Sequence, residues 1–306
     1  MKKIQKIILI IVLILILVFG TKICITQYKS FVNKSNNYID IIQLKAENEN
    51  PQMMSYLIKT KNGKVVMIDG GNAVDSIHLQ NRINECGGKV DYWFLTHYHQ
   101  DHTGAICEII NNTDIEISNI IADFCDRELV EKYESHRLDQ YDRIVDSLND
   151  DKVKDKIIIP TESQIFEIDN LKIKILSLYK DDIFENLGNN TSMIFKLYIN
   201  DKSFLVLGDL GKERCIQVMD ECLEELDSDY VQMAHHGQNG VTFEFYQAVS
   251  PDYCLWPTPE WLWNNDNGGG YNSGAWKTLE TREWIKQLDV NENYIAKDGD
   301  KVIRIF

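Results

Sequence analysis

The sequence has little positive charge. Its 306 residues carry 32 lysines and arginines against 47 aspartates and glutamates, which gives a formal net charge of -15. A surface with this balance repels polyanions on average, which argues against nonspecific coating of nucleic acid, although one basic groove remains compatible with it. Low-complexity tracts and internal repeats are also missing. With 44% hydrophobic residues, the chain can build one sizeable domain, or two small ones, with a real core.

Several familiar motifs are missing as well. The seven cysteines form no C-x-x-C pair, so their spacing indicates neither a structural zinc site nor a disulfide framework. We expect buried free thiols, with one disulfide left open if the chain is exported. There is no G-x-S-x-G, and the glycine-rich stretch "NNDNGGGYNSG" lacks the Lys-Ser/Thr ending of a phosphate loop.

Only one hydrophobic run is long, and it lies at the N-terminus. Three lysines in "MKKIQK" precede an uninterrupted apolar run from Ile7 to Phe19. No A-x-A pattern follows, so we expect residues 1–25 to be an uncleaved signal anchor, a single transmembrane helix, with residues 26–37 as a tether. Cleavage near Gly20 is the alternative. Either way the lysines stay inside and the rest of the chain is displayed outside the cell membrane.

Residues 38–306 alternate strand and helix patterns and are expected to form one α/β domain. Apolar runs that end in turn residues predict strands, including 38–44, 64–71, 171–179 and 202–209. The charged segment 126–151 predicts one long surface helix, and 293–306 predicts a closing hairpin with its turn at "DGD". We therefore expect two sheets covered by helices on their outer faces.

The stretch "DYWFLTHYHQDHTGA" concentrates metal-ligand side chains at the end of a strand. His97 and His99 are spaced to point at one ion, and Asp101 with His102 can reach a second ion just past the turn. Two further strand ends supply a carboxylate, in "FLVLGD", and a histidine pair, in "AHHG". The isolated His78 and His136 are expected to be ordinary polar groups.

This pattern resembles the metallo-β-lactamase superfamily. "THYHQDHTGA" has its H-x-H-x-D-H signature, "VVMIDGG" looks like its first motif, "LGD" like its bridging aspartate and "AHHG" like its last histidine motif. The order "NNTSMIFKL", "FLVLGD", "HHG" is most similar to the ComEC-type hydrolase domain of competence proteins. The resemblance covers about residues 38–306 and implies a four-layer αββα sandwich with a metal site at one edge.

The resemblance also implies roles for individual residues. It places one or two divalent ions, zinc first and manganese as the alternative, on six ligands: His97, His99, Asp101, His102, Asp209 and His235. Asp101 and His236 are expected to take part in catalysis, with His236 contacting phosphate or donating a proton. Which of His235 and His236 binds metal is left open, with His235 preferred. Asp69 is expected to hold the ligand loop by hydrogen bonds.

One departure concerns the first ion. Many superfamily members add a histidine between the signature and the bridging aspartate, and here Asn189 or Asn190 occupies that stretch. Amide oxygen is a weaker zinc ligand than imidazole, so we expect Asn190 to be at most a weak ligand and the first site to be looser.

The expected chemistry is hydrolysis by metal-activated water, most simply of phosphodiesters, as in a nuclease. Alternatives are a hydrolase of lactams, lactones or thioesters, a phosphocholine esterase acting on cell-wall phosphodiesters, and a non-catalytic anchored binding protein. The aromatic segment after residue 255 suggests first a buried loop plug and, as the functional alternative, a mobile substrate wall over the metal edge. The candidate wall residues are Trp256, Trp261, Trp263 and Tyr271.

Overall fold

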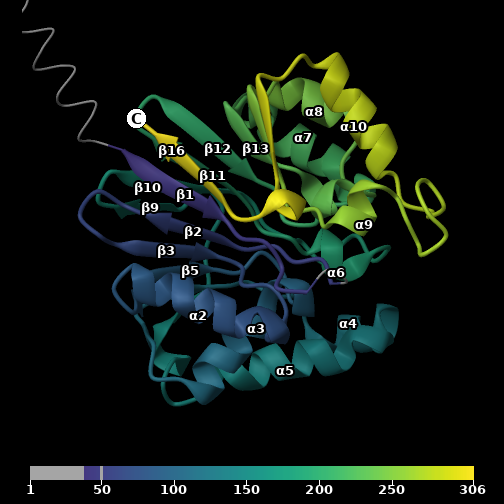
Figure 1. The fold of residues 1–306 in the computed structure, drawn as a ribbon. Coiled ribbons are helices and arrows are strands. Elements are labelled where there is room, and N and C mark those ends of the chain that lie inside the picture. The colour runs from purple at the N-terminus through teal and green to yellow at the C-terminus, as the bar shows by residue number, and fades with distance from the viewer. Residues whose placement is uncertain (1–37, 49–50) are drawn as a thin grey trace, which may run out of the picture. The chain divides into compact units, whose positions relative to one another are not determined.

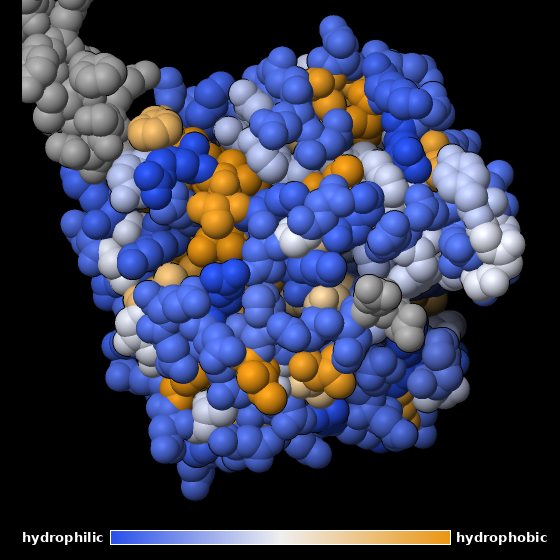
Figure 2. All heavy atoms as spheres, in the orientation of Figure 1, coloured by the Kyte–Doolittle hydropathy of each residue, from blue (hydrophilic) through white to orange (hydrophobic). Residues whose placement is uncertain are grey.

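The computed structural model describes residues 38–48 and 51–306. Within these residues, no helix is long and apolar enough to cross a bilayer. The expected anchor at 1–25 and the expected tether at 26–37 lie outside the described residues, so both stay predictions. The face seen in Figure 2 is mostly hydrophilic, in keeping with the acidic composition.

Two seven-stranded sheets form the centre of the domain (Figure 1). The first has the order β16-β1-β2-β3-β5-β7-β8, and the second has the order β15-β14-β13-β12-β11-β10-β9. The strands of the first sheet are β1 (Ile39–Gln43), β2 (Tyr56–Lys59), β3 (Val65–Ile68), β5 (Tyr92–Phe94), β7 (Ile120–Ile121), β8 (Ile157–Ile158) and β16 (Lys301–Ile305). Those of the second are β9 (Ile165–Ile168), β10 (Leu171–Ser177), β11 (Ile194–Ile199), β12 (Lys202–Val206), β13 (Tyr230–Gln232), β14 (Tyr253–Trp256) and β15 (Glu292–Ile295). A separate pair is formed by β4 (Lys89–Val90) and β6 (Glu116–Ile117).

Helices cover the outer faces of both sheets (Figure 1). Against the first sheet lie α2 (Ser76–Glu85), α3 (Gln100–Asn112), α4 (Arg127–Tyr133) and α5 (Leu138–Leu148). Against the second lie α7 (Lys212–Leu226), α8 (Phe243–Val249) and α10 (Thr278–Gln287). Short helices are α6 (Leu187–Asn190) and α9 (Glu260–Trp263), with single turns η1 (Ala73–Asp75), η2 (Ser135–Arg137), η3 (Lys154–Lys156), η4 (Ala234–Gly237) and η5 (Ala296–Asp298).

Three apolar clusters hold these four layers together. The central cluster lies between the sheets, where the Phe94 ring packs 5.3 Å from Phe195 and the Tyr56 ring packs 5.7 Å from Phe204, centroid to centroid. The outer clusters join each sheet to its helices. The described cysteines are all free, as the sequence indicated. The expected αββα layering is therefore observed for the described domain.

Two sequence predictions about elements were wrong. The segment 126–151 is not one helix, because the backbone leaves helical geometry at Glu134, where φ is -141° and ψ is 42°. The C-terminal strands do not form a hairpin. Instead β15 pairs in parallel with β14, and β16 pairs antiparallel with β1 in the other sheet. Local turn chemistry predicted the "DGD" turn but could not show that the chain changes sheets there.

The ends of parallel strands bring the candidate ligands to one edge. β3 and β5 run parallel, and Asp69 and the signature loop follow their carboxyl ends. β12 and β13 also run parallel, and Asp209 and the two adjacent histidines follow theirs. Parallel strands finish at the same edge of a sheet, so residues far apart in sequence meet there.

Candidate metal centre

Asp69 holds the signature loop, from His97 to His102, by hydrogen bonds. Its backbone is left-handed, with φ at 51°, which turns the carboxylate back toward β5. One carboxylate oxygen accepts from the Thr96 N–H at 2.8 Å, and the other accepts from the Thr96 hydroxyl and His102 Nδ1, both at 2.7 Å. The pair is fully buried. Asp69 thereby fixes the ring of His102 with Nε2 pointing away, toward the strand ends opposite.

Four buried ligand-type side chains converge beyond that ring. One atom each from Asp101, His102, Asp209 and His236 lies within 4.8 Å of every other. His236 Nε2 lies 3.3 Å from Asp101 Oδ2 and 3.4 Å from Asp209 Oδ2, and His102 Nε2 lies 3.3 Å from Asp209 Oδ1. Two carboxylates and two imidazoles are a donor set that suits zinc and similar divalent ions.

Unpaired buried atoms test whether these residues fit a cation. Within the described part of the chain, His102 Nε2, His236 Nε2 and Asp209 Oδ1 are buried without a hydrogen-bond partner, and so are His97 Nε2 and Asn189 Oδ1 beside them. Each such group costs about 1–3 kcal/mol when left unsatisfied in a protein interior. All five atoms carry lone pairs in the ligand form of their side chain. The residues therefore fit a divalent ion, which would satisfy them together.

In His236 and His97, the ring nitrogen that faces away from the cluster, Nδ1, is held by a hydrogen bond within the protein. His236 Nδ1 lies 2.8 Å from the Pro257 carbonyl, which makes it the donor, and His97 Nδ1 lies 3.1 Å from the Thr96 hydroxyl. Hydrogen bonds of this kind set the tautomer and ring orientation of metal-binding histidines. They leave Nε2 as the nitrogen that faces the cluster in each ring.

His99 is held through Nε2 instead of Nδ1, and its partner is Glu134, a residue that the sequence analysis missed. Its Nε2 lies 3.4 Å from Glu134 Oε2, which also accepts from Tyr98 Oη at 2.5 Å and from the Gly188 N–H at 2.9 Å. This leaves Nδ1 of His99 for a first ion. The only sequence signal was an acidic residue within a predicted helix, and nothing marked the break that turns it inward.

Gly188 is needed at this point because the backbone passes close to the ligand. A Cβ at position 188 would collide with His99 Nε2 and would lie 2.5 Å from Glu134 Oε2. Any side chain there would displace the ring or the carboxylate that orients it. α6, which begins one residue earlier, is thus placed against the first ion position.

The two asparagines of α6 have different surroundings. Asn190 Oδ1 accepts from the Gly211 N–H at 3.0 Å, and Asn190 Nδ2 donates to the Glu185 carbonyl at 2.9 Å. Those bonds make Asn190 a structural residue rather than a weak ligand. Asn189 has the unpaired oxygen, and its Nδ2 lies 3.3 Å from His235 Nε2. The residue at the looser first site is therefore Asn189.

The adjacent histidines also divide differently from the expectation. Both have left-handed backbones, with φ of 50° at His235 and 54° at His236, and this strained turn sends the two rings in different directions. His236 joins the four-residue cluster. His235 Nε2 lies farther out, 3.9 Å from Asp209 Oδ2, at the wall of an open cavity. The geometry favours His236 as the ligand in place of His235.

Charges in the cluster are strongly coupled. Burial alone would raise the pKa of Asp209, but the neighbouring His236 and His102 hold that pKa well below its usual value. Burial alone would lower the pKa of His236, but the neighbouring carboxylates of Asp209 and Asp101 raise it to about 9. Without a metal, protons on histidine balance the carboxylates. A divalent cation supplies the same positive charge.

A cavity of about 430 Å³, called the metal cavity below, opens in front of the cluster. Asp101, Asp209, His99 and His235 line it, together with residues of the α4–η2 break and of α6: Tyr133, Glu134, His136, Arg137, Asn186, Leu187 and Asn189. His136 was expected to be an ordinary polar group, and the break brings it to the cavity wall. His78 lies elsewhere, 3.2 Å from Asp300.

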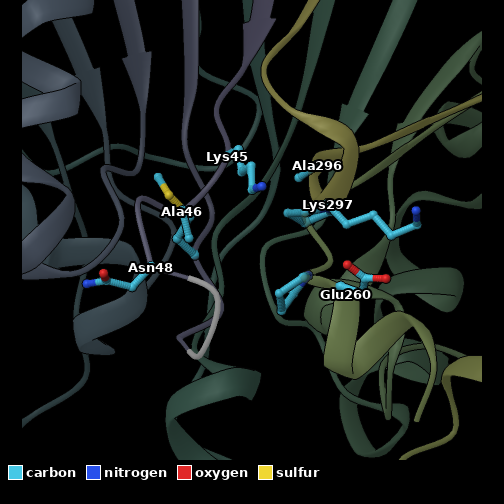
Figure 3. Close-up of a pocket in the computed structure, with 9 residues that line it drawn as sticks. Lys45, Ala46, Asn48, Glu260, Ala296 and Lys297 are labelled. Atoms are coloured by element: carbon cyan, nitrogen blue, oxygen red, sulfur yellow. The ribbon is translucent and has the colours of Figure 1, made fainter. Parts of the chain in front are cut away.

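A second cavity lies away from the cluster. Figure 3 shows residues of the N-terminal segment facing residues of the C-terminal segment across it, namely Lys45, Ala46 and Asn48 against Glu260, Ala296 and Lys297. Its volume is about 30 Å³, which is the space of a single water molecule. It is too small for a substrate.

None of the tryptophans proposed as a substrate wall lines the metal cavity. Trp256 is buried, with Nε1 bonded to Asn293 Oδ1 at 2.7 Å, and its ring packs on Trp263. Trp261 packs on Trp276, and Tyr271 is 69% exposed at the tip of the loop. Trp256 is therefore packed as a buried plug predicts, whereas Tyr271 is exposed and does not line the metal cavity.

Comparisons with known proteins agree with this geometry. A family model described as the metallo-beta-lactamase superfamily matches residues 52–303. The fold is similar to that of YhfI from Bacillus subtilis, described as a metallo-beta-lactamase fold protein, with a TM-score of 0.54 and 14% identity over 88% of this chain and 100% of that one. It is also similar to CmlA, a diiron beta-hydroxylase from Streptomyces venezuelae, with a TM-score of 0.51 and 11% identity over 87% of this chain and 54% of that one. No curated protein matches the sequence.

Proposed function

The chain belongs to the metallo-β-lactamase superfamily, and we propose that it is a metal-dependent hydrolase of phosphoester bonds, closest in type to the ComEC hydrolase domain. The observation that carries the proposal is the buried cluster of Asp101, His102, Asp209 and His236 with its unpaired atoms. We propose zinc as the first candidate ion and manganese as the second.

Different residues of the site would hold the ions and contact the substrate. Asp101, His102, Asp209 and His236 would hold one ion, and His97 and His99 with the oxygen of Asn189 would hold a second, looser one. A bound divalent ion lowers the pKa of water and polarises the substrate's ester oxygen. Asp101 also accepts from Gln52 Nε2 at 2.8 Å, which fixes its carboxylate. We propose that His235, which lies at the cavity wall, contacts the substrate.

Phosphoester substrates are supported by the order of motifs. "NNTSMIFKL", "FLVLGD" and "HHG" follow one another as in the ComEC-type domain, with an amide where many superfamily members have a third histidine at the first site. The cavity is open enough for a polymer end or a diester.

We also propose that residues 1–25 anchor the protein in the cell membrane and display the domain outside the cell. Protease accessibility in intact cells tests that arrangement.

The test compares substrates on one metal-loaded preparation of the full-length protein. Bound metal is measured, and turnover is followed on bis(4-nitrophenyl) phosphate, DNA, a phosphocholine diester, nitrocefin and a lactone. We expect turnover of phosphodiesters, lost in Asp209→Asn and retained in Asp220→Asn, an exposed aspartate on α7. Hydrolysis of nitrocefin or the lactone with no phosphodiester turnover would reject the proposal.

A further inference from the structure

Arg137, at the wall of the metal cavity, has no anionic partner among the residues that the structure describes. Its Nε is buried and has no hydrogen-bond partner, and Nη1 donates only to the neutral Gln140 Oε1, at 3.3 Å. The other arginines all have stronger partners. Carboxylates pair with Arg82, Arg127, Arg143 and Arg304, and backbone carbonyls accept from Arg214 and Arg282.

The position of Arg137 relative to the metal ligands is fixed by two links. Its backbone N–H donates to the Glu134 carbonyl at 2.8 Å, and the Glu134 side chain bonds His99. Gln140 Oε1, which accepts from Arg137, also accepts from the Gln100 N–H at 3.3 Å, next to His99. The guanidinium is therefore held beside the signature loop, on the side of the looser first site.

The charge around the cavity favours an anion at this point. The carboxylates that line it are already engaged, Asp101 and Asp209 in the cluster and Glu134 with Tyr98, His99 and Gly188. Arg137 is the arginine that lines this cavity, in a chain whose formal net charge is -15. A planar guanidinium with free donors matches the oxygens of a phosphate or carboxylate group.

We propose that Arg137 binds an oxyanion of the substrate in the metal cavity, and that this oxyanion belongs to the phosphoester. The proposal rests on the proposed function for its choice of phosphate over carboxylate. Arg137 is then a specificity residue, which holds the substrate's charge while the ions act on the scissile bond. Its contribution is to substrate binding, so it belongs in KM more than in kcat.

The experiment compares wild type with Arg137→Gln and Arg137→Lys, using Arg143→Gln as the control. Arg143 lies on the neighbouring helix α5 and pairs with Glu108. For each full-length, metal-loaded protein we measure kcat and KM on bis(4-nitrophenyl) phosphate, and binding of inorganic phosphate and of acetate by calorimetry. Metal content and circular dichroism confirm that each variant is folded and loaded.

We expect Arg137→Gln to raise KM and weaken phosphate binding by about 10- to 100-fold while kcat stays within about threefold. Arg137→Lys should keep part of the affinity, and Arg143→Gln should match wild type. Values within twofold of wild type for Arg137→Gln would overturn the proposal. A larger loss for acetate than for phosphate would overturn the assignment to a phosphoester.

Failure of the proposed function gives a different result. Wild type would then show no phosphodiester turnover, but phosphate binding would still depend on Arg137 if the oxyanion site exists. Absence of phosphate binding to metal-loaded wild type would overturn the site itself.

Discussion

His235 and His236 are adjacent in sequence but have different surroundings. The left-handed backbone at both positions sends the His236 ring into the four-residue cluster and the His235 ring to the cavity wall. Each ring can then do separate chemistry. A sequence pattern cannot distinguish them, because they are adjacent and follow the same strand, β13, by three and four residues.

Separate roles predict separate losses on substitution. We expect His236→Ala to lose about one bound metal ion per chain, because the cluster keeps only three of its donors. His235→Ala should keep its metal and lose turnover, since its ring stands outside the cluster. Metal content after dialysis, measured by atomic emission, distinguishes the two variants. Metal loss from His235→Ala alone would restore His235 as the ligand.

At the scale of elements, the break between α4 and η2 is what completes the site. A continuous helix over 126–151 would keep Glu134 and Arg137 on a regular helical surface. The observed break points the Glu134 carboxylate at His99, Tyr98 and Gly188 and brings Arg137 to the same cavity. The break in the predicted helix therefore positions the Glu134 carboxylate that orients the ring of His99.

We expect Glu134→Gln to weaken metal binding at the first site by about 10- to 100-fold, because an amide orients the His99 ring less well than a carboxylate. Titration calorimetry with the divalent ion measures the loss directly, apart from turnover. Glu131→Gln, exposed on α4, is the matched control and should bind as wild type does. Equal affinities in all three proteins would show that Glu134 has no role in metal binding.

A second element-scale contact lies where the chain passes from β15 to β16. The Asp300 carboxylate there accepts from Arg82 Nη2 at 2.6 Å and from the Lys45 N–H at 2.9 Å, and it lies 3.2 Å from His78 Nε2. Burial alone would raise the pKa of Asp300, but these partners, His78 foremost, lower it to about 2. The hydrogen bond to Asp300 raises the pKa of His78.

We expect Asp300→Asn to lower the free energy of unfolding by about 2 kcal/mol near pH 5 to 6. The Asp300 contribution is present above the unfolded pKa of about 4 and is lost as pH falls toward its folded pKa. The His78 contribution is present below the unfolded pKa of about 6.5 and is lost as pH rises through its folded pKa. Urea unfolding from pH 3 to 9 should therefore show the largest deficit in mid-range, while Asp289→Asn serves as control. A deficit independent of pH would contradict this account.

For the whole molecule, the metal centre joins the two sheets. Its residues come from strand ends in both sheets, so an ion held among them also ties the two halves of the sandwich together. Metal binding should therefore stabilise the entire domain and not only its edge.

We expect a metal at 1,000 times its Kd to add about 4 kcal/mol to the free energy of unfolding, which raises Tm by roughly 10 °C. Differential scanning calorimetry with and without EDTA measures this difference. Asp209→Asn should show little shift, because it lacks the carboxylate that lies between His102 and His236 in the cluster. A Tm in wild type that does not respond to EDTA would contradict a structural contribution of the ion.

The sequence alone determined the layers and the ligand types. Strand runs ending in Asp69, in the signature from His97 to His102, and in Asp209 are local patterns, and parallel strand ends must share an edge. Those patterns identify a metal centre because four ligand-type side chains within six residues have few other uses.

Only the tertiary structure decided which neighbours complete the centre. The helix break at Glu134, the choice of His236 and Asn189, the exit of β16 into the other sheet and the burial of Trp256 all depend on long-range packing. None of these has a local signal, because a side chain's direction follows from what the rest of the fold packs against it.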